Sequence, residues 1–135
     1  MIGDWFQIDG KVYDVSVMSI RESATILYSE NTGRTMSVGA RMTLDPLGCF
    51  IGHRLVVRRK ADKLNDYDRL FNDIIQPRYD GMRVKAVHGQ TTIDYDAYVS
   101  AAEREVERID DAGNHVYWKE MEINIVPMEA QVLPV

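Results

Sequence analysis

Alternation of apolar and polar side chains with a period of two is the feature that most constrains the fold of this chain. It is clearest between Phe50 and Lys60 (FIGHRLVVRRK). Successive side chains of a β-strand point to opposite sides, so each strand has two distinct faces. The more apolar face of this run is predicted to be buried, and it carries Ile51, His53, Leu55, Val57 and Arg59.

Similar runs recur along the chain and indicate its fold class. They cover residues 11–21, 23–28, 41–44, 82–88, 91–101 and 115–129, whereas residues 103–110 fit either a strand or a short helix. A turn is expected at residues 29–34 (SENTGR), where Asn31 and Gly33 suit positive φ. The strands do not alternate with helices, which argues against a parallel sheet. We therefore expect a mainly β (α+β) fold, an antiparallel β-sandwich or split barrel of about seven strands.

One segment has a helical pattern instead. Residues 64–76 (LNDYDRLFNDIIQ) place apolar side chains at i, i+3, i+4, i+7 and i+8 from Tyr67, and Pro77 follows. This spacing predicts a single flanking helix whose apolar stripe faces the core. The acidic side chains Asp66, Asp68 and Asp73 are expected to form a solvated face, with the first two near the positive end of the helix dipole.

Composition excludes several classes of protein. The 135 residues fit one domain, residues 1–135, and the apolar and charged fractions of 45% and 27% are those of a folded globular chain. The single Cys49 excludes an internal disulfide and favours a reducing compartment. The net charge of −5 argues against sequence-independent nucleic-acid binding. No signal-peptide pattern and no apolar run of membrane-spanning length are found.

The spacing of reactive residue types predicts no catalytic or cofactor-binding set. The glycines at 33, 39, 48 and 52 match neither phosphate-binding loop, and Cys49 is about 13 Å from His53 along a strand, too far for a hydrogen bond. Asp94 and Asp96 share a strand face but lack further oxygen ligands for a metal. The basic side chains of residues 54 and 58–60 are expected to be edge-strand charge. We therefore expect no enzyme activity, no cofactor and no metal.

Two other readings of the residues stay open. A standalone small β-barrel binding or adaptor module would need a pocket lined by Tyr95, Tyr98, Tyr117 or Trp118. A small hydrolase would need its chemistry from the histidines His53, His88 or His115.

Several short motifs resemble the small tail proteins of long-tailed bacteriophages and prophages, the tail-tube and distal-tail hub family. They are Gly33-Arg34-Thr35, Gly39, Asp45-x-Leu47-Gly48, DYDRLFNDIIQP (66–77), TIDYDAYV (92–99) and VYWKEMEINIVPMEAQ (116–131). The motifs occur in the order found in that family and cover most of the chain. Gly48-Cys49 departs from the Gly-Thr often present in such proteins, which puts the contacts of that loop in doubt.

The resemblance implies a structural role in a tail tube or hub ring, with a slight preference for the hub. It implies a ring-forming homo-oligomer, hexameric, that also contacts neighbouring tail proteins and no membrane. DNA would be only cargo passing through a lumen. The protein would lie in the virion tail after synthesis in the bacterial host cytoplasm.

The resemblance also implies that residues 29–48 form an extended arm that reaches a neighbouring subunit. We call this segment the arm. Its apolar side chains cannot be buried by a glycine-rich segment alone, so a neighbour is expected to cover them. The predicted subunit-interface residues are Arg34, Met36, Val38, Arg41, Met42, Leu44 and Leu47.

Overall fold

The computed structural model describes residues 5–36, 38–61, 64–110, 112–113 and 115–135. Its elements are β1 (Gln7–Ile8), β2 (Ser16–Tyr28), β3 (Gly33–Arg34), β4 (Met42–Thr43), β5 (Pro46–Arg58), α1 (Leu64–Ile74), β6 (Met82–His88), β7 (Thr91–Glu103), β8 (Val106–Asp110), β9 (His115–Trp118) and β10 (Met121–Pro127). The predicted mainly β fold, with antiparallel strands and one flanking helix, is confirmed.

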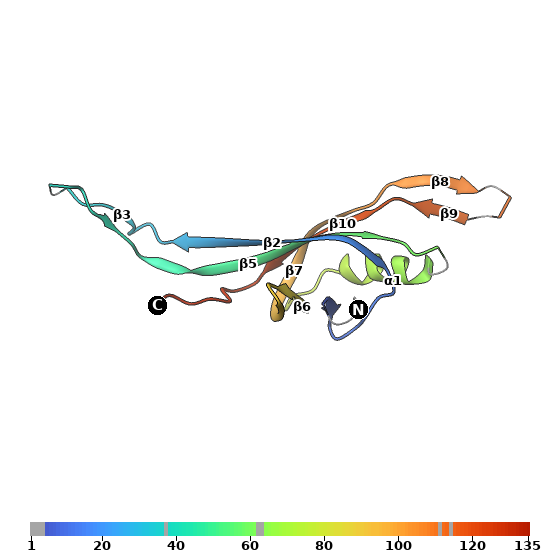
Figure 1. The fold of residues 1–135 in the computed structure, drawn as a ribbon, viewed down its shortest axis with the longest axis horizontal. Helices are drawn as coiled ribbons and strands as arrows, with labels where there is room; N and C mark the ends of the chain where they lie inside the picture. The colour runs from blue at the N-terminus through green and yellow to red at the C-terminus, as the bar shows by residue number, and fades with distance from the viewer. Residues whose placement is uncertain (1–4, 37, 62–63, 111, 114) are drawn as a thin grey trace.

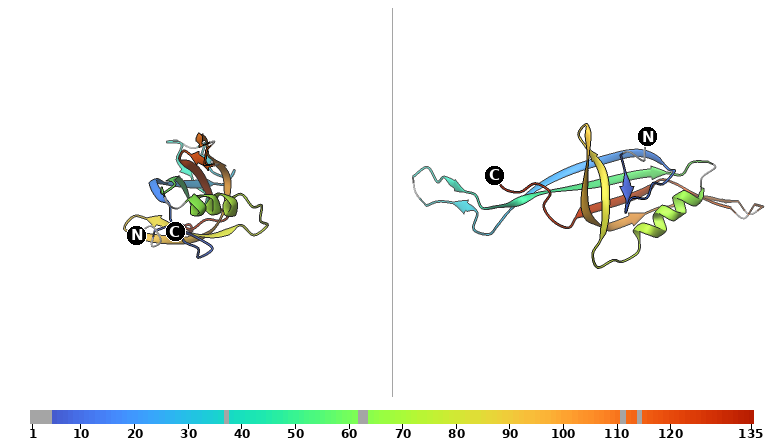
Figure 2. Two further views of the ribbon diagram at one scale, coloured as in Figure 1. Left: turned by 90° about the vertical axis from the view of Figure 1, so that its right-hand side faces the viewer. Right: turned by 90° about the horizontal axis from the view of Figure 1, so that it is seen from below.

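Six strands form one antiparallel sheet in the order β1-β6-β7-β10-β5-β2. Strand β7 belongs to both halves of this sheet, because it pairs with β6 from Thr91 to Ala97 and with β10 from Ala97 to Glu103. The sheet bends along β7, so that β6 and the start of β7 cross β2 and β5 at a steep angle (Figure 2). Among the described residues the sheet does not close into a barrel, and β1 and β2 are its edges.

Two hairpins extend beyond the body of the molecule. Strands β2 and β5 run together toward one end and continue into the small β3–β4 ladder, whereas β8 and β9 project toward the other end (Figure 1). The elongated shape follows from these long strand pairs, because one strand residue adds about 3.3 Å of length.

The core lies where the bent sheet, α1 and the N-terminal segment meet. Its most deeply buried side chains, each 0% exposed, are Leu55, Val57, Leu70, Val84, Ala86, Ala97, Met121 and Ile123. The β5 face predicted to be buried is buried from Ile51 to Val57, whereas Arg59 on the same face is half-buried. Strand β10 shows the same period, since Ile123 and Ile125 are buried while Glu122 and Asn124 are exposed.

Helix α1 places Tyr67, Leu70 and Ile74 in the core, as its spacing predicts. It ends at Ile74, before the predicted end at residue 76, because a residue that precedes a proline disfavours helical backbone. Ile75, the last member of the predicted stripe, is 49% exposed as a result.

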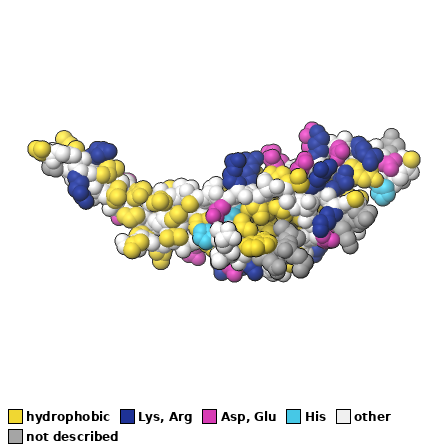
Figure 3. All heavy atoms as spheres, viewed as in Figure 1, with side chains coloured by type: hydrophobic (Ala, Val, Ile, Leu, Met, Phe, Trp, Pro, Cys, Tyr) yellow, Lys and Arg dark blue, Asp and Glu magenta, His cyan; other side chains and the backbone are white. Residues whose placement is uncertain are grey.

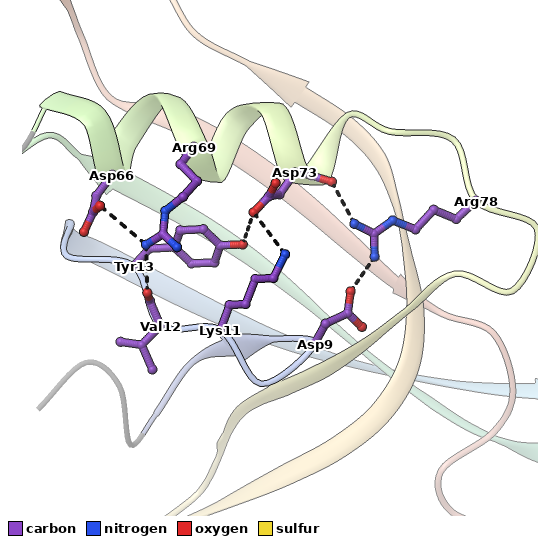
Figure 4. A network of polar contacts seen from close by, with 8 residues as sticks. All are labelled: Asp9, Lys11, Val12, Tyr13, Asp66, Arg69, Asp73 and Arg78. Atoms are coloured by element: carbon purple, nitrogen blue, oxygen red, sulfur yellow. Dashed lines mark hydrogen bonds and ion pairs between the residues drawn. The ribbon is translucent and has the colours of Figure 1, made fainter.

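The N-terminal segment is fastened to α1 through carboxylates of the helix (Figure 4). Asp66 Oδ2 accepts a hydrogen bond from the backbone N–H of Asp14 at 2.8 Å, and Asp73 Oδ2 accepts one from the hydroxyl of Tyr13 at 2.5 Å. The prediction of a purely solvated acidic face is therefore wrong for Asp66 and Asp73. Helical spacing alone could not show that a segment more than 50 residues away in the sequence covers this side.

Some predicted boundaries are wrong. Residues 16–28 form one strand, β2, because its pairing with β5 continues through Glu22. A turn does lie at residues 30–31, but the hairpin reverses at Gly39 and Ala40, whose φ angles are 86° and 45°. Gly33, expected in the turn, pairs with Thr43. Residues 103–110 are strand on both sides of a short break, and the run 115–129 divides into β9 and β10.

We expect the fold to lose stability above about pH 10, because buried tyrosines must ionise there. Burial raises the pKa of Tyr13, Tyr67 and Tyr95, that of Tyr67 to about 12. A group whose pKa is higher in the folded state stabilises the fold fully below its unfolded pKa, and this contribution is lost as pH rises through the folded pKa. Circular dichroism and tyrosinate absorbance, followed from about pH 9 to 12, measure this loss.

Tyr67→Phe removes one of these ionisations, so the free energy of unfolding should fall less steeply with pH in this variant. Tyr79→Phe is the matched control, because the Tyr79 side chain is fully exposed. Identical slopes for the Tyr67 and Tyr79 variants would contradict the explanation.

Candidate assembly surface

The arm, residues 29–48, forms the far end of the β2–β5 hairpin and extends away from the core (Figure 1). Near its tip, Arg34 lies opposite Met42 in the β3–β4 ladder. At its base, the Asp45 carboxylate accepts a hydrogen bond from the Ser29 hydroxyl, and the Asp45 N–H donates to Thr32 Oγ1 at 2.9 Å. These polar contacts fix the base of the arm without burying its apolar side chains.

All seven residues predicted to form a subunit interface are exposed. Met36 and Val38 are fully exposed, and Leu44 and Leu47 are 59% and 54% exposed. Covering apolar surface contributes roughly 25 cal/mol per Å², so a second molecule that buried these side chains would be bound favourably. The structure thus places these side chains where a partner can reach them; that they form an interface stays a prediction.

The exposed apolar surface extends beyond the seven predicted residues, and Figure 3 shows hydrophobic side chains gathered along the arm and the hairpin that carries it. Ile26, Leu27 and Tyr28 at the end of β2 are each more than 40% exposed, as are Val132 and Leu133 in the C-terminal tail. The exposure of Ile26–Tyr28 could have been predicted from the sequence, because three consecutive large apolar residues leave a strand without a polar face.

The C-terminal tail, residues 128–135, is held beside β5 where β10 has ended. The Gln131 side chain acts like a peptide group: its Oε1 accepts from Ile51 N–H at 2.9 Å, and its Nε2 donates to Ile51 O at 2.7 Å. Cys49 N–H donates to Val132 O at 2.8 Å. Gly48 is required here, because its φ is 143° and a Cβ would lie 2.6 Å from that of Ala130. The tail thereby adds its apolar side chains at the base of the arm.

His53 is buried, 2% exposed, between the two halves of the bent sheet. Its Nε2 lies 2.8 Å from Val87 O and its Nδ1 lies 2.6 Å from the Tyr95 hydroxyl. A carbonyl can only accept, so Nε2 donates to Val87 O, while Nδ1 shares the second hydrogen bond with the Tyr95 hydroxyl. Both ring nitrogens therefore hold the fold together, and neither is left to act as the general base that a histidine-based hydrolase needs.

His53 also belongs to a polar cluster that the sequence does not predict. Glu22 Oε2 lies 2.7 Å from Nδ1 of His88 and 3.6 Å from Nε2 of His53. Tyr95, which is hydrogen-bonded to His53, completes the cluster. The four residues come from strands β2, β5, β6 and β7, so only the bend of the sheet brings them together. Their sequence spacing carries no signal of this contact.

The other candidates for chemistry are dispersed or neutralised. Arg54 pairs with Glu122 at 2.9 Å, Arg59 with Glu107 at 3.4 Å and Lys60 with Asp14 at 2.6 Å. The prediction of edge-strand charge is wrong, because β5 lies between β10 and β2 in the sheet. Asp96 pairs with Arg83 at 3.3 Å. Within the described ranges, no group of three or more His, Cys, Asp or Glu side chains is arranged to hold a metal ion.

The aromatic residues considered for a ligand pocket do not share one cavity among the described residues. Tyr95 is buried against His53, and Tyr98 lines a groove beside the end of α1. Arg108 stacks over Tyr117 at 4.1 Å from the ring centroid. A further arginine, Arg104, stacks over Trp118 at 4.1 Å and Phe71 at 4.0 Å, which fixes the β8–β9 hairpin beside α1.

Comparison with models of protein families gives no match, and comparisons with curated proteins and with solved structures find none either. In the part of the chain that the structure describes, no helix has the length and apolar character needed to cross a lipid bilayer.

Proposed function

We propose that this chain is a non-enzymatic structural component of a bacteriophage or prophage tail, in the tail tube or the distal-tail hub ring. The observation that carries the assembly part of the proposal is the arm, whose apolar side chains are exposed at the end of a long hairpin. The short motifs shared with tail proteins support the placement in a tail.

An arm that docks on a different surface of the next copy makes a heterologous, head-to-tail contact. Such contacts close into a ring if the rotation between copies allows it, and otherwise give an open filament. A hexameric ring that stacks on other tail proteins would use the first arrangement. The net charge of −5 suits a lumen for DNA, because a wall of like charge does not hold the phosphate backbone.

Light-scattering mass across a concentration series of the full chain, with electron micrographs of the most concentrated sample, tests the proposal. We expect the mass to rise with concentration and rings or tubes to be visible. A monomer at every concentration would contradict self-assembly. Rings with a basic inner wall would contradict the lumen argument.

A further inference from the structure

A groove of about 430 Å³ lies between the C-terminal end of α1 and strand β7. Ile74, Ile75 and Pro77 form one side, and five consecutive β7 residues, Tyr98 to Ala102, form the other. Successive side chains of a strand point to opposite faces, so a groove lined by consecutive residues follows the edge of the strand. This groove is therefore bordered by backbone as well as by side chains.

That edge of β7 has no strand partner among the described residues. Pairing with β6 stops at Met82–Ala97, while β7 continues to Glu103 with only β10 on its other side. An unpaired edge presents N–H and C=O groups to which an extended segment can add as a further strand. Ile75 and Tyr98, which are 49% and 46% exposed, would pack against the side chains of such a segment.

Carboxylates lie beyond the groove at the end of β7, where Glu103 directly follows the lining residue Ala102. Glu103 and Glu120 line one hollow there and make no ion pair with the described residues, whereas Glu105 pairs with Lys119 at 3.5 Å. The tip of the arm, residues 33–44, has the opposite charge, because its only charged side chains are Arg34 and Arg41, whereas Glu30 and Asp45 lie at the base of the arm. Neither arginine makes an ion pair within the described part of the chain.

We propose that this groove receives the arm of a second copy of the chain, with the apolar arm residues beside Ile75 and Tyr98 and the arm arginines beside Glu103 and Glu120. The inference rests on the proposed self-assembly and identifies the surface that receives the arm. The extended, apolar tip of the arm suits an unpaired strand edge with an apolar side, and its two arginines suit the carboxylates just beyond the groove. Within one molecule the arm tip and the groove are separated by the β2–β5 hairpin, so the contact joins two copies (Figure 1).

Charge reversal on each side of the contact tests this assignment. Glu103→Lys with Glu120→Lys, and separately Arg34→Glu with Arg41→Glu, should each raise the concentration for half-maximal assembly at least about tenfold. Mixing the two variants should restore assembly, because each arm then meets a groove of opposite charge. Asp94→Lys with Asp96→Lys is the matched control, since it makes the same charge change at exposed carboxylates of β7 outside the groove and should assemble like the natural chain.

Thermal melts of every variant confirm that the fold is retained before assembly is compared. If the Glu103 and Glu120 variant assembles at the natural concentration, or if mixing restores nothing, the groove is not the receiving surface, and the proposed function stands as long as the natural chain assembles. If the natural chain stays monomeric throughout, the proposed function fails, and this inference fails with it.

Discussion

The double variant Met42→Asp with Leu44→Asp is expected to abolish assembly while leaving the fold intact. Both side chains lie on the arm, 41% and 59% exposed, so aspartate is solvated there in the free chain. In an interface, each change removes about 1.5–3 kcal/mol of apolar burial and adds a carboxylate that must lose water. Together they should weaken association by at least about a hundredfold, as measured by light-scattering mass over the concentration series.

A matched control separates this effect from added negative charge. Val12→Asp with Met18→Asp makes the same chemical change at two apolar side chains that are 46% and 54% exposed but lie outside the arm. This control should assemble like the natural chain, and both variants should keep the natural circular dichroism spectrum and melting temperature. An arm variant that unfolds as a monomer would show that the segment belongs to the core and that the interface reading is wrong.

The parts of the fold that could be predicted are those set by local periodicity. The buried face of β5 follows from alternation between Ile51 and Val57, because one face of a strand is buried or exposed as a unit. The α1 stripe from Tyr67 to Ile74 follows from helical spacing for the same reason. In both cases the buried face of the element can be predicted from about ten consecutive residues.

Long-range pairing could not be predicted in this way. The cluster around His53 depends on the bend of the sheet, and the contacts of Asp66 and Asp73 depend on where the N-terminal segment returns. The Gln131 contact to Ile51 spans 80 residues. Periodicity says which face of an element is buried and not which element buries it.

The candidate assembly surface likewise has one part that could be predicted from the sequence and one that could not. The resemblance to tail proteins implies the arm, and the apolar side chains of a glycine-rich segment that cannot cover them agree with it. The groove beside β7 could not be predicted, because it exists only where pairing with β6 stops at Ala97 and pairing with β10 continues. The unpaired edge arises because β6 and β10 pair with different parts of β7, and this register cannot be read from the sequence of any one strand.

Leu55→Ala is expected to be among the most destabilising single changes in the chain, at about 2–5 kcal/mol, because Leu55 is fully buried on β5 and truncation leaves a cavity. The free energy of unfolding of a domain of this size is about 5–15 kcal/mol, so this loss of stability would lower the melting temperature by roughly 10 °C. Chemical denaturation of the full chain, at a concentration below assembly, measures the free energy of unfolding without a contribution from the oligomer.

Leu44→Ala makes the same change in the arm, where the side chain is 59% exposed, and should alter the free energy of unfolding by less than about 0.5 kcal/mol. The two variants should therefore have opposite effects on stability and assembly. Leu55→Ala should lower the free energy of unfolding while the folded chain still assembles, and Leu44→Ala should weaken assembly while the free energy of unfolding is retained. Equal losses of stability would mean that the arm packs on the body in solution, which would remove the surface on which self-assembly depends. A stable Leu44→Ala chain that assembles poorly would instead show that folding and assembly use separate parts of one hairpin, since β5 supplies Leu55 to the core and continues from the base of the arm.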